Sequence, residues 1–277
     1  MPELPEVELV ARSLDRLVRG RRILAAELLR PRLAPDSTPE EFAGALRGAR
    51  VESVTRRGKH ILINFEGSQV LLVHLRMTGR FLLLPEEREL PKHTHAVFHL
   101  EDARRLAFAD QRHFGLMKLA NADTLQQTKE LRSLAPEPFS ESFTDDYLRT
   151  VLARSRRTMK ETLLDQKKVT GLGNIYAAEV LFLARANPLS VASDFSRRRV
   201  PDLRRAILEV LDESIAHGST MNVDPEDIDG SYYGGAYEGR WRVYDREGEP
   251  CVKCRARIRR VTQAGRSTYF CPRCQRR

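Results

Sequence analysis

All four cysteines of the chain lie at its C-terminal end, as Cys251-x-x-Cys254 and Cys271-x-x-Cys274 with sixteen residues between the pairs. Two thiolate pairs at this spacing suit tetrahedral coordination of Zn2+, and the intervening length fits a two-stranded ribbon. Two disulfides are the alternative, which the lack of an export signal disfavours. A segment this short cannot hold a core without metal, so we expect one structural zinc bound by the four cysteines.

The segment between the cysteine pairs predicts a β-hairpin, because ARIRRVTQAGRSTYF alternates in polarity on both sides of a Gly265 turn. Residues 251–277 also hold nine basic side chains and no acid, which leaves 38 basic and 38 acidic residues in 1–250. The whole net charge of +9 therefore lies in this tail. A local basic block indicates a polyanionic partner, most often nucleic acid, although a solubilising tail fits the charge alone equally well.

The remainder of the chain is typical of one large globular domain or two ordinary ones, since the 277 residues are 41% apolar. No run approaches the length of a membrane-spanning helix. The acidic N-terminus has no basic segment followed by an apolar one, so we expect no signal peptide. These features predict a cytoplasmic protein that has no membrane partner.

Hydrophobic periodicity divides the chain into two regimes. Residues 4–19 place apolar side chains on one helical face, and six short β-rich runs follow between residues 51 and 110, which suggests a sandwich or barrel. Helical periodicity resumes at Phe143 and continues to about His217, after a proline-containing stretch that is typical of a linker. The six β-rich runs are VESVTRR, HILINFE, VLLVHLR, RFLLL, HAVFHL and RRLAFAD.

These patterns predict an α+β fold with an N-terminal helix, a two-layer β-sandwich, a helical domain and a C-terminal zinc ribbon. Residues 218–240 are rich in Gly, Asp and Tyr and predict a long loop, a kind of segment that is often functional. The expected divisions are 1–132 for the sandwich domain, 133–143 for the linker, 144–240 for the helical domain with its loop, and 241–277 for the ribbon.

Short glycine-containing turns carry candidate functional side chains. In GLGNIYAAEVLF, backbone N–H groups at a helix start and the Asn174 side chain form a site suited to a phosphate, although most such turns are only turns. HLRMTG and DQRHFG each end a strand and expose a large side chain, Met77 or Phe114, near a cation. Both residues fit core positions by pattern, and the alternative is a wedge between DNA bases. Lys59, in RRGKH, fits a solvated turn residue.

The chain begins MPELPEVELV, which crowds two prolines and three glutamates into eight residues. Helix punctuation explains Pro5 and the early acids, because the helix dipole favours negative charge in the first turn. The alternative is that the N-terminal residues themselves take part in a chemical reaction.

Taken together, these stretches resemble the formamidopyrimidine-DNA glycosylases of the Fpg/Nei family. The resemblance rests on MPELPEVE, RGK, HLxMTG, FG, GxGNIYxxE and AGRxTxxCPxCQ, which occur in order from residue 2 to the end. It implies base-excision repair of oxidised purines, chiefly 8-oxoguanine and formamidopyrimidines, in damaged double-stranded DNA, with strand cleavage by β,δ-elimination. It also implies a helix-two-turn-helix domain and a monomeric, nucleoid-associated enzyme.

The resemblance assigns roles to residues of this chain. Pro2 is the expected nucleophile once Met1 is removed, Glu3 its acid–base partner, and Glu6 a support of the catalytic site. The residues expected to hold phosphates around the lesion are Lys59, His74, Asn174 and Arg266. Those expected to fill the gap left by the everted nucleotide are Met77, Arg112 and Phe114. Lys160 lies where the family carries a basic residue near the lesion.

The chemistry of the terminus agrees with these roles. A free α-amino group has a pKa of about 7.7–8.0, so part of it is uncharged near neutral pH. The secondary amine of a terminal proline can attack a sugar C1′ and give an iminium, a Schiff-base route to covalent catalysis. Glu3 is adjacent in sequence and can deliver or remove protons near the sugar.

Two positions depart from the family pattern, since Arg76 stands where glycine is usual and His113 where a second arginine is usual. Less charge is then fixed beside the wedge, which leaves the opposite-base preference open. Two other functions also stay open. A Nei-type glycosylase for oxidised pyrimidines uses the same terminus, and a non-catalytic zinc-ribbon DNA-binding protein explains the tail but not the acid–proline terminus.

Overall fold

The computed structural model describes residues 2–221, 224–227, 237 and 239–276. Most of the loop predicted at 218–240 therefore lies outside the described residues. None of the described helices is long and apolar enough to cross a bilayer.

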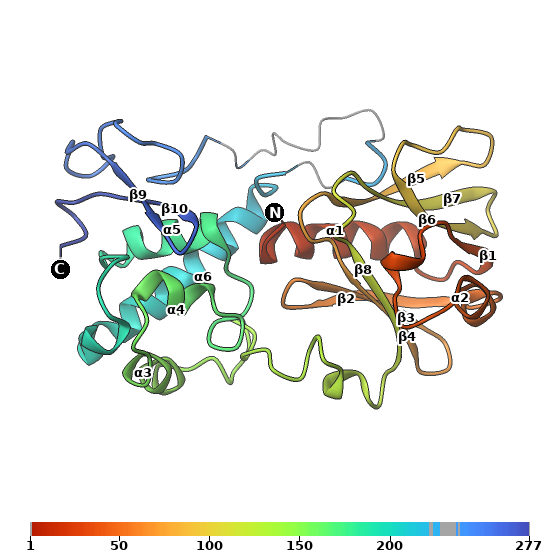
Figure 1. Ribbon diagram of the computed structural model, residues 1–277, viewed down its shortest axis with the longest axis horizontal. Coiled ribbons are helices and arrows are strands. Elements are labelled where there is room, and N and C mark those ends of the chain that lie inside the picture. Colours follow the sequence, from red (N-terminus) through yellow and green to blue (C-terminus); the bar gives the residue numbers. More distant parts are fainter. Residues whose placement is uncertain (1, 222–223, 228–236, 238, 277) are drawn as a thin grey trace. The chain divides into compact units, whose positions relative to one another are not determined.

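The chain divides into two compact units, and each combines a long continuous segment with a second one from later in the sequence (Figure 1). The sequence analysis groups 218–240 with the helical domain, whereas the structure places its first part with the sandwich. The Leu83 N–H, for example, donates to the Pro225 carbonyl at 2.9 Å. The first unit is Met1–Arg132 with Gly218–Ala236, and the second is Ser133–His217 with Tyr237–Arg277.

The first unit begins with helix α1 (Leu4–Val18), as the apolar periodicity predicts. Glu3 is its N-cap and forms a reciprocal capping box with Glu6, and Pro5 occupies the first turn. The prolines and acids of the opening stretch therefore do form the capped start of a helix. This local role is compatible with a chemical one, because capping uses the Glu3 carboxylate and backbone but leaves the nitrogen of Pro2 uninvolved.

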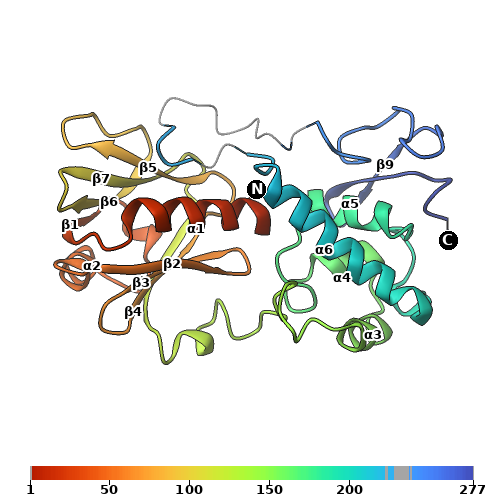
Figure 2. The ribbon, with the colours of Figure 1, turned by 180° about the vertical axis from the view of Figure 1, so that it is seen from behind.

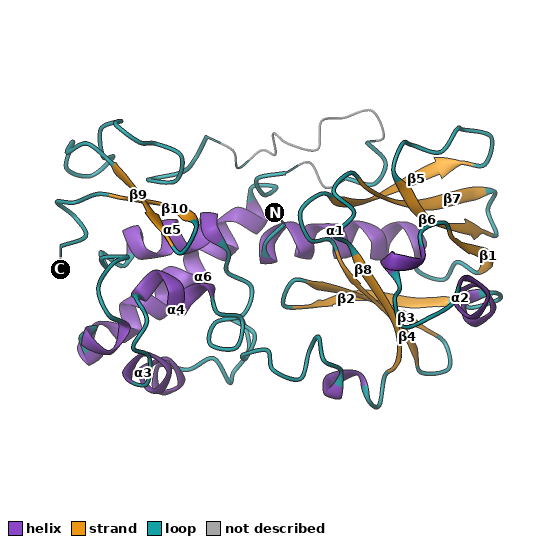
Figure 3. Cartoon of the chain, in the orientation of Figure 1, coloured by secondary structure: helices purple, strands orange, loops and turns teal. Residues whose placement is uncertain are grey.

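Eight strands of the first unit form two antiparallel four-stranded sheets, with the orders β1-β6-β7-β5 and β2-β3-β4-β8 (Figure 3). All six predicted β-rich runs are strands, which confirms the sandwich. The strands are β1 (Ile23–Leu28), β2 (Val51–Arg57), β3 (His60–Phe65), β4 (Gln69–His74), β5 (Gly79–Pro85), β6 (Thr94–Leu100), β7 (Arg104–Asp110) and β8 (Leu116–Asn121).

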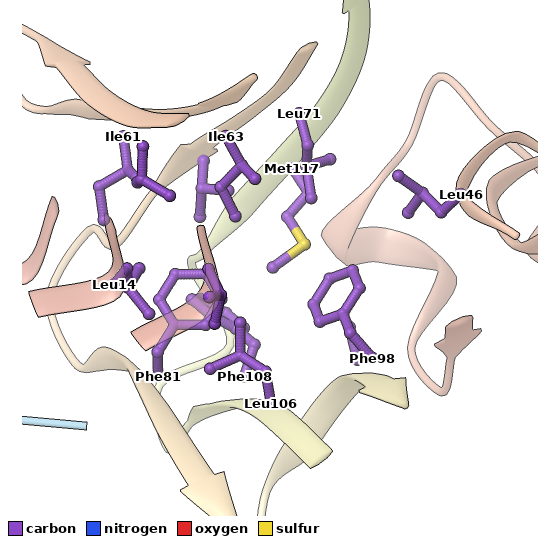
Figure 4. Packing of buried hydrophobic residues seen from close by; sticks show 14 of the residues in the cluster. Leu14, Leu46, Ile61, Ile63, Leu71, Phe81, Phe98, Leu106, Phe108 and Met117 are labelled. Atoms are coloured by element: carbon purple, nitrogen blue, oxygen red, sulfur yellow. The ribbon is translucent and has the colours of Figure 1, made fainter. Parts of the chain in front are cut away.

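The core of the first unit lies between the two sheets and includes one face of α1 (Figure 4). Leu14 of α1 packs with Ile61 from one sheet and with Phe81 and Phe108 from the other. The rings of Phe81 and Phe108 meet edge to face with their centroids 5.2 Å apart. This packing fixes the ends of β4, β5 and β7, from which the candidate wedge residues project.

The described residues of the second unit form four α-helices and a hairpin, as predicted for the helical domain and the ribbon. Helix α5 is buried on nearly every side and packs against α6 (Figure 2) and against β10 (Figure 1). The hairpin turns at Ala264 and Gly265, both with positive φ (48° and 73°), as a tight two-residue turn requires. The elements are α3 (Asp145–Ala153), α4 (Met159–Leu164), α5 (Asn174–Leu183), α6 (Val200–Ala216), β9 (Arg259–Gln263) and β10 (Arg266–Phe270).

Shorter elements connect these parts. The sequence patterns do not predict α2, which packs on β1 and begins with a capping box between Thr38 and Glu41. The remaining elements are α2 (Pro39–Leu46) and the 3-10 turns Pro31–Leu33, Leu125–Gln127, Ala192–Asp194 and Arg197–Arg199.

Candidate functional site

The N-terminal segment of the first unit is buried and tightly tied by hydrogen bonds. Pro2 is buried, and Glu3 and Glu6 are 2% and 1% exposed. One oxygen of Glu6, Oε2, accepts from the Glu3 backbone N–H at 2.8 Å. The other, Oε1, accepts from the hydroxyl of Thr220 at 2.8 Å and from its N–H at 3.2 Å. Glu6 thus joins the start of α1 to the segment that follows α6.

Thr220 is a residue that the sequence analysis missed. It lies 214 positions from Glu6 in the sequence, in a stretch with weak periodicity, so no local pattern relates the two. The sequence offers one signal, an acid near a helix start. If such an acid is buried, both of its carboxylate oxygens need hydrogen-bond donors. With Thr220 and Glu3 as those donors, Glu6 is a fully bonded carboxylate that supports the terminus.

Lys59 lies in the turn between β2 and β3 and is 6% exposed, so it is not the solvated turn residue that its sequence context suggests. Next to it, the register of β3 with β4 pairs His60 with His74, and the two rings meet edge to face at 4.6 Å. Burial lowers the pKa of His74 to about 2, and the neighbouring positive charge of Lys59 adds to the effect. Lys59 therefore lies close enough to His74 to act on it electrostatically.

The hydrogen bond of His74 also fixes its tautomer. The Arg76 backbone N–H donates to Nδ1 of His74 at 3.0 Å, so Nδ1 is unprotonated and the proton of the neutral ring lies on Nε2. His74 is consequently a neutral N–H donor at physiological pH. Arg76 itself is exposed and has a positive φ of 54°.

The three expected wedge residues lie on two turns that are bonded to one another. Met77 is half-buried in the turn after β4, and Arg112 and Phe114 are exposed in the turn after β7. The Thr78 hydroxyl donates to Oδ1 of Asp110, and the Arg112 N–H bonds to both Thr78 Oγ1 (3.0 Å) and that same oxygen (3.1 Å). Asp110 Oδ2 accepts from the Gly115 N–H at 2.7 Å. Thr78 and Asp110 thus bond the two turns to each other; the sequence analysis quotes both within HLRMTG and DQRHFG but gives them no role.

Phe114 is 54% exposed, which a wedge requires and a core residue would not show. The guanidinium of Arg112 lies over its ring, 5.1 Å from the centroid. The glycines that follow in MTG and FG have a packing reason. A Cβ at Gly79 would lie 2.7 Å from Phe108 Cζ, and one at Gly115 would lie 2.8 Å from the same atom. The buried ring of Phe108 therefore packs directly against the backbone of both turns, at Gly79 and Gly115.

In the second unit, Lys160, which the resemblance places near the lesion, is 1% exposed. Its ammonium donates to the Ser267 carbonyl at 2.7 Å and to the Thr268 hydroxyl at 2.8 Å. Asn174, at the first position of α5, donates to the same carbonyl at 3.1 Å. The two side chains join the helices to the hairpin strand directly after Arg266, which is exposed at the turn. Lys160 is a buried support for Arg266 and Asn174.

Glu179 of α5 is a second buried support; it ends the GxGNIYxxE motif, but the sequence analysis gives it no role. It is fully buried and accepts three backbone N–H bonds, from Arg242 at 2.8 Å and from Val243 and Tyr244 at 2.9 Å. Burial raises the pKa of this carboxyl, and the three N–H donors oppose that rise. The bonds fasten the chain to α5 just before the first cysteine pair.

The four cysteines come together as a ligand set, with all their sulfur atoms within 4.8 Å of one another. Cys251 Sγ lies 3.9 Å from Cys274 Sγ, and Cys254 Sγ lies 3.4 Å from Cys271 Sγ. Four sulfurs at about 2.3 Å from a tetrahedral zinc ion stand roughly 3.8 Å apart, so the set fits Zn2+. The predicted zinc ribbon is confirmed, and its metal is structural because four protein ligands leave no open position.

Comparisons with known proteins cover nearly the whole chain. Residues 1–117 match the formamidopyrimidine-DNA glycosylase N-terminal domain, 134–224 match the formamidopyrimidine-DNA glycosylase H2TH domain, and 248–277 match the zinc finger found in FPG and IleRS. The formamidopyrimidine-DNA glycosylase of Desulforamulus reducens is 39% identical over 277 residues, which cover 100% of this chain and 99% of that protein.

Solved structures agree with these matches. Lactococcus lactis Fpg bound to FAPY-dG containing DNA is 32% identical, with a TM-score of 0.91 over 99% of this chain and 100% of that one. The same enzyme bound to oxidized pyrimidine containing DNA gives a TM-score of 0.92 at 32% identity over 100% of both chains.

Proposed function

The chain belongs to the formamidopyrimidine-DNA glycosylase family, and on this premise we propose that it excises oxidised purines from duplex DNA and then cleaves the strand. The substrates are 8-oxoguanine and formamidopyrimidines. The observation that carries the proposal is the N-terminal constellation. A terminal proline stands directly before a buried acid, and a second acid, bonded from both sides, supports the first.

In this proposal the amine of Pro2, freed by removal of Met1, attacks C1′ of the damaged nucleotide. The glycosidic bond breaks and the base leaves with a proton. The C1′–O4′ bond of the sugar then opens, O4′ takes a proton that Glu3 helps to supply, and the nitrogen remains bound to C1′ as an iminium. The iminium acidifies the C2′ proton. Its removal expels the 3′ phosphate, and a second elimination expels the 5′ phosphate.

Glu6 contributes by position. Its two oxygens hold the Glu3 N–H and Thr220, so the backbone that carries Pro2 and Glu3 starts from a fixed point. Preorganisation of this kind reduces the loss of freedom at the moment of attack. The role requires no proton transfer by Glu6 itself.

DNA contacts divide into those that hold phosphates and those that displace the base. We assign Lys59 and the neutral Nε2–H of His74 to phosphates near the lesion, together with Asn174 and Arg266 from the second unit. Residues 1–132 then supply the catalytic terminus and the wedge, and residues 144–277 supply further phosphate contacts. Extrahelical placement of the base costs a few kcal/mol, which these contacts offset.

The wedge is assigned to Met77, Arg112 and Phe114. The exposure of Phe114 supports this role, as does the bonding of its turn to the Met77 turn through Thr78 and Asp110. An apolar ring that enters the stack fills the space of the expelled nucleotide and stabilises the kinked duplex.

One observation favours a second candidate, an activity on oxidised pyrimidines. The Lactococcus lactis enzyme, alike over the full length, has been solved with oxidized pyrimidine containing DNA. A glycosylase with the same terminus and a tolerant pocket would process both classes.

A substrate panel with borohydride trapping tests the proposal. We expect a covalent complex, with the adduct on residue 2, on duplexes that contain 8-oxoguanine or formamidopyrimidine, and slower trapping on an oxidised pyrimidine. Faster processing of the pyrimidine would favour the second candidate. Binding without trapping on any lesion would leave only a DNA-binding protein.

A further inference from the structure

Three histidines meet at the turn that carries Arg112 and Phe114. Nδ1 of His113, in the turn, lies 2.9 Å from Nε2 of His95, in β6, so one ring donates a hydrogen bond to the other. The two rings are nearly parallel, with an interplanar angle of 11° and centroids 4.9 Å apart. The ring of His93 packs edge-on against His113 at 5.5 Å. The sequence motifs single out His113 only as a departure from the family pattern.

The backbone of His113 needs support. Its φ is +59°, in the left-handed region that non-glycine residues seldom adopt, and such conformations persist where the surroundings hold them. The His113 N–H donates to the Asp110 carbonyl at 3.2 Å. The other anchor is His95, which is 4% exposed and belongs to the sheet.

His113 stands between the two exposed wedge residues. Its ring is engaged with His95, while the Arg112 guanidinium lies over the ring of Phe114, which is itself 54% exposed. A side chain anchored at the middle of a short turn limits the directions open to its two neighbours. The bond to the sheet therefore sets where Arg112 and Phe114 project.

We propose that His95 and His113 form a latch that positions the wedge turn, and that expulsion of a damaged base depends on this latch whereas cleavage at a preformed abasic site does not. The proposal rests on the proposed function. Both histidines are positioning residues, because they act through Arg112 and Phe114.

The latch has a defined protonation requirement. The bond needs one ring nitrogen with a free lone pair, so it survives a single proton on the pair and fails when both rings are charged. The groups that face His95 are His113, His93, Arg30 and Asp110. Burial lowers the pKa of His95, the charge of His113 adds to the effect, and Asp110 opposes it. His95 thus remains an acceptor at pH values below the ordinary histidine pKa of about 6.5.

The test compares two rates for each variant, namely excision of 8-oxoguanine from a duplex and cleavage of the same duplex with a preformed abasic site. His113→Ala removes the latch, and we expect the ratio of excision to cleavage to fall about tenfold while abasic-site cleavage stays within about twofold. His113→Asn is the matched control. Asparagine tolerates a left-handed backbone, and its amide can donate to a neutral His95 or accept from a protonated one, so this variant should restore most of the ratio.

The pH profile separates the latch from a merely structural role. In the wild-type protein the ratio should fall on the acid side, because protonation leaves the pair without a ring nitrogen that can accept the bond. In His113→Asn the amide oxygen still accepts from a protonated His95, so the acid-side fall should disappear.

An unchanged ratio in His113→Ala, or an equal loss of both rates, would overturn the latch. Failure of the wild-type protein to cleave abasic DNA would instead contradict the proposed function. Nitrogen NMR of the two rings then decides the latch without any activity. A shared bond predicts one coupled titration, and two independent titrations near the ordinary histidine pKa would reject it.

Discussion

The paired rings of His60 and His74 make the first unit sensitive to acid. Burial lowers the pKa of His60 to about 4 and that of His74 to about 2, whereas both titrate near 6.5 when unfolded. Below pH 6.5 the unfolded chain gains two protons that the folded chain does not bind. Stability is therefore complete above about pH 6.5 and falls below it, by up to about 1.4 kcal/mol per pH unit for each ring.

We predict that His74→Gln halves this acid dependence. Glutamine can still accept from the Arg76 N–H but does not titrate. The unfolded variant therefore gains one proton instead of two relative to the folded protein. Urea unfolding at several pH values between 7.5 and 5 measures the slope of the free energy of unfolding. An unchanged slope would show that His74 is protonated in the folded protein.

An experiment at Pro2 distinguishes the proposed catalytic role of the N-terminus from its role in starting helix α1. One residue added ahead of Pro2 turns its amine into an amide and should abolish borohydride trapping. DNA binding should remain within about threefold, because the proposed phosphate contacts lie elsewhere. The capping box uses Glu3 and Glu6 and should keep α1 folded. Full activity with an extended terminus would leave the opening stretch with its helix-capping role alone.

The sequence identifies functional residues where a short local pattern indicates their chemistry. The cysteines are found from their spacing alone. Pro2 and Phe114 receive their proposed roles from the family resemblance, because the local pattern around Phe114 also fits a core position. Thr220, Asp110 and Glu179 were given no role because each is defined by a partner distant in the sequence or by burial. Lys160 was placed near the lesion by the resemblance alone, and no sequence pattern indicates its burial or its bond to the Ser267 carbonyl.

At the scale of secondary-structure elements, the strands with β-branched and aromatic runs were predictable, and β1 and β8 were not. β1 reads ILAAEL, with two alanines and no alternation, and β8 reads LMKLAN. Both are strands because they pair with β6 and β4, which supply ladder bonds and a buried face. Tertiary pairing decides such weak sequences.

Variants in and beside the hairpin β9–β10 can distinguish a residue that contacts a DNA phosphate from a residue that holds the hairpin in place. Arg266→Ala should lower the salt slope of DNA binding by about one and leave the melting temperature unchanged, as expected for one phosphate contact. The matched control is Arg259→Ala, at the far end of the hairpin from the turn, which should leave the slope unchanged.

Lys160→Met should give the complementary result. It removes a charged donor from the Ser267 carbonyl and from the Thr268 hydroxyl, and a hydrogen bond to a charged group contributes about 1.5–3 kcal/mol. Asn174 still donates to the Ser267 carbonyl. The second unit should melt earlier and DNA affinity should fall, with the salt slope unchanged. A loss of slope without a change in melting would instead identify Lys160 as a phosphate contact.

On the scale of the whole molecule, the two units have separate cores, but the zinc ribbon is not peripheral to the second. Gln275, fully buried next to the last cysteine, donates to the Ala186 carbonyl at 2.9 Å and accepts from the Cys271 N–H at 2.8 Å. Asn187 donates to the Gln275 carbonyl at 2.9 Å. With Lys160, Asn174 and Glu179, these bonds join the ribbon to the helices at several buried points. Its folding and that of the helices are therefore coupled.

We accordingly predict that zinc removal unfolds more than the ribbon. A strong chelator, or Cys254→Ser, should lower the melting temperature of the whole second unit, because the buried partners of Ser267, Gln275 and Glu179 lose their geometry together. The first unit should melt as before, since its sandwich core contains no part of the ribbon. Trp241 is the single tryptophan and lies in the second unit, 5.0 Å from the ring of Tyr244, so its fluorescence reports that unit alone.

Calorimetry should then show one transition that moves with zinc and with the Trp241 signal, and one that does not. Restoring zinc to the chelated wild-type protein should return the first transition, whereas Cys254→Ser should not respond. DNA affinity should fall with the zinc-sensitive transition, because Arg266 and Asn174 both depend on the hairpin. If Trp241 fluorescence and helix content were indifferent to zinc, the ribbon would be an independent appendage, and the buried bonds of Lys160 and Gln275 would contribute little to the stability of the helices.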